Sequence, residues 1–217
     1  MAKKQEKMIF LISNSPCADE RVTHLQVCEI KFEKFANLGE FDSIIITSKN
    51  AIKALEFNQI CVDLNTQIYA IGEASFNEAK KFGFKNIYLA KNSHGSEFAN
   101  EILPLLKGRV LYLKAKETIS NLDKFLLQNG VNLSVITAYE NVELNLANSA
   151  KPPKNSVLIF TSPKNVRSFM ANFGWDESYK AVSIGNTTAK ILQEFCEPKI
   201  CENQSINSAI NLALLII

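Results

Sequence analysis

The feature that most constrains this chain is an internal repeat of two motifs. The first motif is a short apolar run followed by Thr-Ser and a helix-like stretch, and it occurs in Ser43–Ile52 and again in Val157–Val166. The second motif is an apolar run that ends in Ile-Gly, and it occurs in Ile68–Ser75 and in Ala181–Thr188. The serine of the first motif precedes the glycine of the second by 24 positions in one copy and by 23 in the other. A repeat with this order and spacing predicts two domains of similar fold.

The two copies are offset in a circular manner. The strand-like run Val110–Lys114 follows the first pair of motifs, whereas its counterpart Met8–Ile12 opens the chain. Such an offset is expected if one domain is inserted into the other, so that the second domain is built from both chain ends. We therefore predict an inserted domain over residues 35–143 and a discontinuous domain formed by residues 1–34 and 144–217.

Two stretches are candidates for the crossings between these domains. Apolar and polar residues alternate near residues 25–34 and 134–143, and a period of two is typical of an extended strand. Elsewhere, short runs rich in Ile and Val alternate with helix-like segments, which is typical of parallel sheets covered by helices on both faces. The sequence therefore predicts an α/β protein with two doubly wound parallel-sheet domains and a two-stranded connector.

Start and stop signals mark several of the helices. Ser75 and Glu78 have the spacing of a capping box, which predicts a helix that begins at Ser75 and ends near Gly83. Ser162 followed by Pro163 places a capping side chain before a proline in the first helical turn.

Composition excludes several classes of function. The 24 basic and 22 acidic residues nearly cancel, and no basic run is interleaved with aromatic residues, so nucleic-acid binding is not expected. The apolar run Met8–Ile12 is shorter than the roughly 7–15 residues of a signal-peptide core. Ile206–Ile217 is shorter than the roughly 20 residues that span a bilayer. We expect a cytoplasmic protein without a membrane partner.

The common catalytic and cofactor signatures are also missing. The chain has five cysteines without CxxC spacing and two histidines far apart in sequence, so neither a disulfide framework nor a zinc site is predicted. Its eight glycines form no GxGxxG, no phosphate-binding loop motif and no GxSxG elbow. We therefore expect no metal and no organic cofactor, and any catalysis should depend on positioning the substrate.

Four strand-to-helix turns carry small hydroxyl residues or glycine. They are Thr47-Ser48, Gly72–Ser75, Thr161-Ser162 and Gly185–Thr188. In doubly wound sheets such turns lie at the carboxyl ends of the strands, where ligands bind, and the adjoining helix N-termini attract anions. The turns therefore predict a receptor for a polyanion. The alternative for each of them is a capping residue that only satisfies the helix backbone.

The ordered motifs resemble those of the uroporphyrinogen-III synthase family. The resemblance runs from about Phe41 to the C-terminus and includes Thr-Ser, Ile-Gly-x-x-Ser, Leu-Tyr-Leu-Lys, Ile-Thr-Ala-Tyr, Phe-Thr-Ser-Pro and Ser-Ile-Gly-Asn-Thr-Thr-Ala. It implies two flavodoxin-like domains with the substrate bound between them. It also implies a monomeric, cyclising hydro-lyase of haem biosynthesis, which converts hydroxymethylbilane to uroporphyrinogen III with loss of water and inversion of ring D.

The resemblance also assigns roles to individual residues. Tyr139 occupies the place of a connector tyrosine, and we take it as the proton donor for the leaving hydroxyl. Strict alternation along its strand places Tyr139 on one face with Thr137 and Asn141. The candidate substrate-binding residues are the turn residues and two lysines that suit carboxylates: Thr47, Ser48, Gly72, Ser75, Lys114, Ser162, Lys180, Gly185, Thr187 and Thr188.

Alternatives stay open for these residues and for the whole chain. Tyr139 is otherwise a connector aromatic residue that packs one domain against another, and Lys114 and Lys180 are otherwise solvated surface lysines. A lined receptor for an anion does not by itself indicate turnover. The alternative function is therefore a non-catalytic, two-lobed anion-binding or sensory module.

Overall fold

The computed structural model describes residues 8–36, 38–92, 95–118 and 120–217. The chain forms two compact units, which we call unit 1 (Met1–Glu29 with Val142–Ile217) and unit 2 (Ile30–Asn141). Both passages between the units fall inside strands, β3 (Cys28–Phe32) and β8 (Leu133–Glu143), which are neighbours in one sheet.

Unit 2 contains a sheet with the strand order β3-β8-β7-β4-β5-β6. The strands from β8 to β6 are all parallel. Its elements are β4 (Ser43–Ile46), α1 (Lys49–Phe57), β5 (Gln67–Ala70), α2 (Glu73–Phe82), β6 (Ile87–Leu89), α3 (Gly95–Ile102), the 3₁₀ turn η1 (Leu103–Leu105), β7 (Val110–Ala115) and α4 (Leu122–Gln128).

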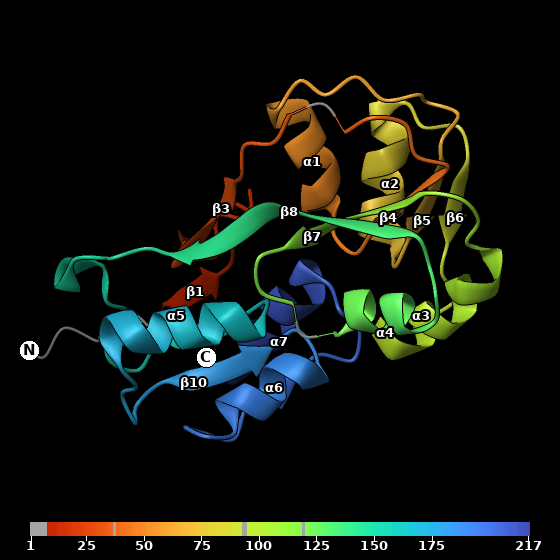
Figure 1. The fold of residues 1–217 in the computed structure, drawn as a ribbon. Coiled ribbons are helices and arrows are strands. Elements are labelled where there is room, and N and C mark those ends of the chain that lie inside the picture. Colours follow the sequence, from red (N-terminus) through yellow and green to blue (C-terminus); the bar gives the residue numbers. More distant parts are fainter. Residues whose placement is uncertain (1–7, 37, 93–94, 119) are drawn as a thin grey trace, which may run out of the picture. The chain divides into compact units, whose positions relative to one another are not determined.

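Helices cover both faces of this sheet because its central strands are apolar on both sides. Ile44 and Ile46 pack with α1 and α2 in one buried cluster, whereas Ile45 packs with α3 and α4 in another. Figure 1 shows α1 and α2 on one side of the strands and α3 and α4 on the other. This arrangement buries a continuous apolar run rather than every second residue, as parallel sheets require.

Unit 1 contains a parallel sheet with the strand order β11-β10-β9-β1-β2. Phe10 and Ile12 pack with α5 and α6 on one face, and Ile9 and Leu11 pack with α7 on the other. Its elements are β1 (Ile9–Ile12), β2 (Thr23–Leu25), the 3₁₀ turn η2 (Asn148–Ala150), β9 (Val157–Phe160), α5 (Pro163–Phe173), β10 (Lys180–Ser183), α6 (Asn186–Leu192), β11 (Lys199–Ile200) and α7 (Ile206–Ile216).

The parallel strands of the two units follow the same spatial order. If β4, β5, β6, β7 and β8 are numbered 1 to 5, the sheet of unit 2 has the order 3-2-1-4-5 from β6 to β8. If β9, β10, β11, β1 and β2 are numbered 1 to 5, the sheet of unit 1 has the same order from β11 to β2. The first and fourth strands are neighbours at the point where the order reverses, which is β4 beside β7 in unit 2 and β9 beside β1 in unit 1. The structure confirms the predicted α/β class with parallel sheets.

The helix ends correct one prediction. Ser162 caps α5 with Pro163 in the first turn, and Gly83 ends α2 in the left-handed region at φ +114°, both as predicted. However, the N-cap of α2 is Gly72, three residues before Ser75, so the helix begins earlier than the capping box indicated. The Ser75 amide donates to the Gly72 carbonyl at 3.0 Å, so Ser75 already belongs to the first helical turn.

Candidate functional site

The predicted site residues of unit 2 gather at the carboxyl edge of its sheet. Thr47 and Ser48 follow β4, Gly72 follows β5, and Lys114 lies near the end of β7. Tyr139 lies in β8, where it is paired with Ala115 of β7. Because these strands are parallel neighbours, their carboxyl ends meet at one edge, and at β4 and β7 this edge is also the point where the strand order reverses. Ligands of doubly wound sheets bind at such points.

The turn after β4 holds two hydroxyl groups in different ways. The Ser48 side chain caps α1 by accepting from the Asn50 amide at 3.2 Å. The Thr47 hydroxyl lies 3.2 Å from the hydroxyl of Tyr112 in β7. Ser48 therefore has a capping role, whereas Thr47 belongs to a side-chain contact between adjacent strands.

Tyr139 does not lie on the strand face that strict alternation indicated. The register between β7 and β8 shifts between Lys114 and Ala115, so that Lys114 pairs with Thr137 but Ala115 pairs with Tyr139. This bulge adds one residue to β8, and a bulge re-aims the side chains that follow it. As a result Tyr139 packs with Ala138 in the cluster under α1 and α2.

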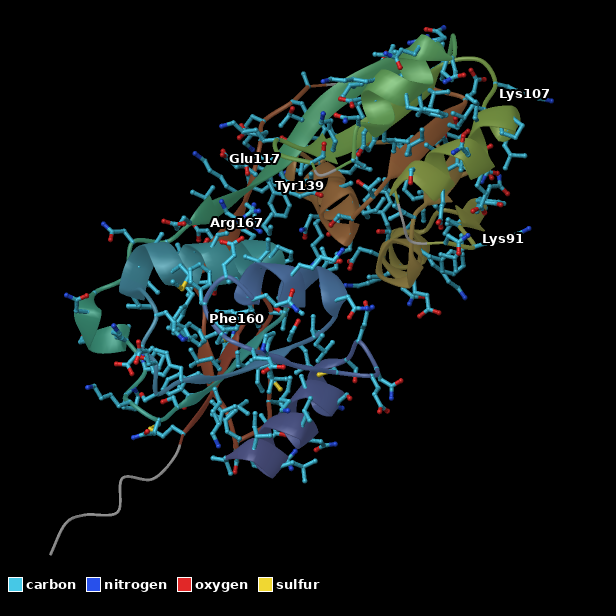
Figure 2. The ribbon with its side chains drawn as sticks, turned by 90° about the horizontal axis from the view of Figure 1, so that it is seen from below. Lys91, Lys107, Glu117, Tyr139, Phe160 and Arg167 are labelled. Carbon is cyan, nitrogen blue, oxygen red and sulfur yellow. The ribbon has the colours of Figure 1, made fainter. Side chains whose placement is uncertain are left out.

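The Tyr139 phenol is buried beside the turn after β4. The residue, labelled in Figure 2, is 6% exposed. Burial raises the pKa of the Tyr139 hydroxyl, and a hydrogen bond with the Ser48 side chain offsets part of that rise. The phenol is therefore protonated at neutral pH and is held next to a predicted substrate-binding residue.

Lys114 is held by an ion pair within unit 2. Its Nζ atom lies 2.6 Å from Oδ2 of Asp123 in α4, and the two side chains are 16% and 20% exposed. Burial raises the pKa of Asp123, but the hydrogen bonds from Lys114 and from the Lys124 amide outweigh burial, so the pKa is lowered overall. Lys114 is thus a fixed cation at the carboxyl edge and not a solvated surface lysine.

At the corresponding edge of unit 1, the Thr161-Ser162 turn is tied to β1 by Asn165. The Asn165 amide group donates to the Ile12 carbonyl at 3.2 Å and to the Thr161 hydroxyl at 2.9 Å. The Thr161 hydroxyl donates to the same carbonyl, and the Ser162 side chain accepts from the Asn165 backbone. Both hydroxyl groups of this turn therefore have structural partners.

The second turn of unit 1 begins α6 at Gly185. The Ser183 hydroxyl donates to the Gly185 carbonyl at 2.6 Å, and a Cβ atom on Gly185 would lie 3.2 Å from the Gln204 side chain. Thr187 is exposed, whereas Thr188 is buried at 3% exposure. Of the two predicted threonines in this turn, Thr187 is therefore the one that is exposed to solvent.

Lys180 does not join the other predicted residues of unit 1. It is the first residue of β10, whereas the Gly185 turn follows the last. Its ammonium donates to the Ile216 carbonyl at 2.5 Å, next to the end of α7. The sequence motif placed Lys180 close to Ile-Gly, but a four-residue strand of about 3.3 Å per residue separates the two at opposite edges of the sheet.

Sequence reasoning missed the polar residues that support the two edges. Tyr112, Asp123 and Asn165 contact predicted site residues, and Tyr112 and Asn165 are each 1% exposed. A tyrosine inside the otherwise aliphatic run of β7 was a signal for a buried hydroxyl that needs a partner. The positions of Asp123 and Asn165 follow from tertiary contacts alone.

His24 is another polar residue at the edge of unit 1. Its Nε2 atom lies 2.8 Å from the Ser13 carbonyl oxygen and 3.3 Å from the Ser13 hydroxyl. Because a carbonyl oxygen only accepts, Nε2 must carry the proton in that contact. This nitrogen is then a donor, and it does not serve as a base toward Ser13.

The described residues set further bounds on the site. Within those parts of the chain, no group of three or more His, Cys, Asp or Glu side chains is arranged to hold a metal ion. None of the helices that they form is long and apolar enough to cross a membrane.

A cavity of about 690 Å³ lies at the amino edge of unit 2, between Asp42, Thr66 and Arg109, and so at the opposite ends of the strands from Thr47 and Lys114.

Comparison with known proteins adds sequence and structural similarity. The family model described as uroporphyrinogen-III synthase HemD matches residues 21–211 of the chain. The crystal structure of uroporphyrinogen-III synthetase from Helicobacter pylori 26695 is 31% identical, with 97% of this chain and 100% of that chain covered and a TM-score of 0.82. A mutant uroporphyrinogen III synthase from the extremely thermophilic bacterium Thermus thermophilus is 16% identical over 90% of each chain, and its TM-score of 0.59 shows a likeness of fold. None of the curated proteins matches the sequence.

Proposed function

This chain belongs to the uroporphyrinogen-III synthase family, and we propose that it performs the family's reaction, with the turns at the carboxyl edge of each unit as substrate-binding elements. The enzyme is a cyclising lyase of tetrapyrrole biosynthesis. It converts hydroxymethylbilane to uroporphyrinogen III, with loss of water and inversion of ring D. The observation that carries the proposed site is the Tyr139 phenol beside Ser48 at the carboxyl edge of unit 2.

In the proposed mechanism Tyr139 donates the proton that lets the substrate's hydroxyl leave. The C–O bond breaks as the phenol protonates the departing oxygen, so water, a phenolate and an azafulvenium cation are formed. The substituted carbon of ring D then attacks the methylene carbon of this cation and gives a spiro intermediate. This intermediate rearranges to the inverted macrocycle, and the proton that ring D finally loses restores the phenol. The Tyr139 phenol carries a proton at neutral pH, and the Ser48 side chain, which lowers its pKa, restores part of the acidity that burial removes.

The protein's larger task in this proposal is to fold the substrate. The linear tetrapyrrole closes spontaneously to the uninverted isomer, so the enzyme must favour the spiro route by orientation. Hydroxyl groups and backbone N–H groups at the turns hold its eight carboxylates. Lys114 contributes a cation, because an ammonium has three protons and Asp123 takes only one of them in the ion pair. Ser48, Gly72, Ser162, Gly185 and Thr187 remain in the proposed binding set with Thr47. Ser75 and Thr188, each 3% exposed, remain as buried residues that support their turns.

The finer description of the fold and of the cellular setting is also a proposal. A flavodoxin-like classification is supported by the order 2-1-3-4-5 in which unit 1 arranges its strands when they are counted along the chain. The near balance of basic and acidic residues supports the proposal that the enzyme does not bind nucleic acid. Its monomeric state and cytoplasmic location are proposals that follow from the resemblance to the family.

Product analysis tests the proposed function. Purified protein is incubated with freshly prepared hydroxymethylbilane, and the products are oxidised to porphyrins and separated by chromatography. We expect mainly the type III isomer. A protein-free incubation gives the spontaneous type I background. Only type I product, formed at the background rate, would contradict the function, and substrate retained unchanged on the protein would instead indicate a binding module.

A further inference from the structure

We propose that Tyr112 is a positioning residue of this enzyme, which orients the Thr47 hydroxyl so that Thr47 donates its proton to a carboxylate of the substrate. The inference rests on the proposed function, because it needs a polyanionic substrate at the carboxyl edge of unit 2. It adds to the site a residue that does not itself touch the substrate.

The position of Tyr112 in the sheet explains how a buried side chain reaches this edge. Tyr112 of β7 pairs with Ile45 of β4, and its ring packs with Phe98 and Leu122 under α3 and α4. Although the residue is 1% exposed, its hydroxyl lies 3.2 Å from Oγ1 of Thr47, two positions beyond Ile45. The contact joins the two strands at which the strand order reverses.

The direction of this hydrogen bond follows from the chemistry of the two groups. Burial raises the pKa of Tyr112 to about 12, so the residue is a neutral phenol at physiological pH. Either hydroxyl could donate in this 3.2 Å contact. A phenol is a stronger acid than an aliphatic alcohol, so the proposed arrangement has Tyr112 as the donor and Thr47 as the acceptor. The Thr47 hydroxyl then keeps one proton for a second partner.

The surroundings of Thr47 indicate which second partner fits. Thr47 is partly exposed, so its hydroxyl can meet a ligand, whereas Tyr112 cannot. A carboxylate only accepts hydrogen bonds, and it is the group that the proposed substrate offers eight times. A chain from the phenol through the alcohol to an anion polarises each bond in turn, which strengthens the contact with the substrate. Lys114 supplies positive charge at the end of the same strand as Tyr112.

The kinetics of four variants test this assignment. Tyr112→Phe removes the phenol hydroxyl, and we expect it to raise KM for hydroxymethylbilane by about 3–10-fold with kcat unchanged, the range that the net worth of a hydrogen bond supports. Thr47→Val should have the same effect, and the double variant should cost no more than either single one. Thr47→Ser keeps a hydroxyl and should restore a KM close to that of the wild type.

Tyr69→Phe is the matched control. Tyr69 is 6% exposed and donates to the Leu105 carbonyl at 3.1 Å, so the substitution also removes a phenol hydrogen bond from unit 2, but away from Thr47. Thermal unfolding of each variant checks the fold, and Thr47→Val tests the same contact from a partly exposed residue if Tyr112→Phe proves unstable.

Two kinetic outcomes would overturn the assignment alone. If Tyr112→Phe raises KM no more than Tyr69→Phe, or if the effects of Tyr112→Phe and Thr47→Val multiply in the double variant, Tyr112 does not act through Thr47. A wild-type protein without type III product would overturn the proposed function and this inference with it. If the wild type forms the type III product and Tyr112→Phe has the same KM as the wild type, this inference is wrong while the proposed function stands.

Discussion

The Ser48 side chain, which caps α1 directly after β4, lowers the pKa of the Tyr139 hydroxyl in β8, although β7 lies between these two strands. The contact links a residue that we propose for proton transfer to a residue that we propose for substrate binding. The Ser48 side chain therefore has two partners, because it accepts from the Asn50 amide and also contacts the Tyr139 phenol. Substitutions at these two positions should therefore have different kinetic signatures.

Tyr139→Phe should lower kcat by about 10²–10⁴-fold, because a proton donor of this kind contributes that much to a rate. Phenylalanine keeps the ring and its packing against Ala138, so stability and KM should change little. Initial rates of type III formation and thermal unfolding measure the two effects. Tyr179→Phe in unit 1, which loses a hydrogen bond to the Pro152 carbonyl, is the control. A folded Tyr139→Phe variant with more than half of the wild-type rate would leave Tyr139 as a packing residue.

Ser48→Ala and Ser162→Ala should each lower the free energy of unfolding by about 0.5–2 kcal/mol, since both serines accept from a backbone amide at a helix start. Ser48→Ala should also lower the rate of type III formation, because it removes the contact with Tyr139. Denaturant unfolding and initial rates separate these effects. Equal stability loss with an unchanged rate in both variants would mean that Ser48 only caps its helix.

Gly108→Ala should destabilise unit 2 more than Gly130→Ala. Both glycines have positive φ, +63° and +77°, and alanine costs about 1–2 kcal/mol in this region. A Cβ atom at Gly108 would also lie 2.1 Å from Oδ2 of Asp42, which accepts from the Arg109 amide at 2.7 Å, whereas nothing lies within 4 Å at Gly130. Denaturant unfolding compares the two. The same loss in both variants would show that Asp42 moves away freely.

The Lys114–Asp123 pair should make stability depend on acid pH. Because the pKa of Asp123 is lowered in the folded state, from a reference value of 3.8, its contribution is present above about pH 4 and is lost as the pH falls through the folded pKa. The stability advantage of the wild type over Asp123→Asn should therefore be constant near neutral pH and shrink below about pH 4. Thermal unfolding across that range measures it. An advantage that grows on acidification would contradict the assignment of this pair.

Removal of metal ions should leave the activity unchanged. The proposed chemistry needs a proton donor and a shaped polyanion site, and neither needs an ion or an organic cofactor. Dialysis against a chelator followed by the type III assay tests this expectation, with dialysis against plain buffer as the control. If activity disappears with the chelator and returns with a divalent cation, a metal ion and not Tyr139 would activate the leaving group.

The local chemistry of the chain determined much of the fold. The repeated apolar runs predicted the parallel strands, because a strand buried on both faces must be apolar throughout, as Ile44–Ile46 are. Ser162-Pro163 and Gly83 predicted helix ends correctly, because a cap and a left-handed turn depend on residues adjacent in sequence. The pattern of the strand-to-helix turn identified Thr47 and Ser48, and the family resemblance added Lys114 and Tyr139. The structure collects all four at one edge of unit 2.

Tertiary structure alone decided the surroundings of these groups. A bulge in β8, set by pairing with β7, turned Tyr139 away from the face that alternation indicated. The length of β10 separated Lys180 from Gly185. Asp123 reached Lys114, and Tyr112 reached Thr47 across 65 positions, through the packing of separate elements. Sequence patterns report the periodicity of one segment, whereas hydrogen bonds and pKa values depend on groups that only the folded chain brings within a few ångströms.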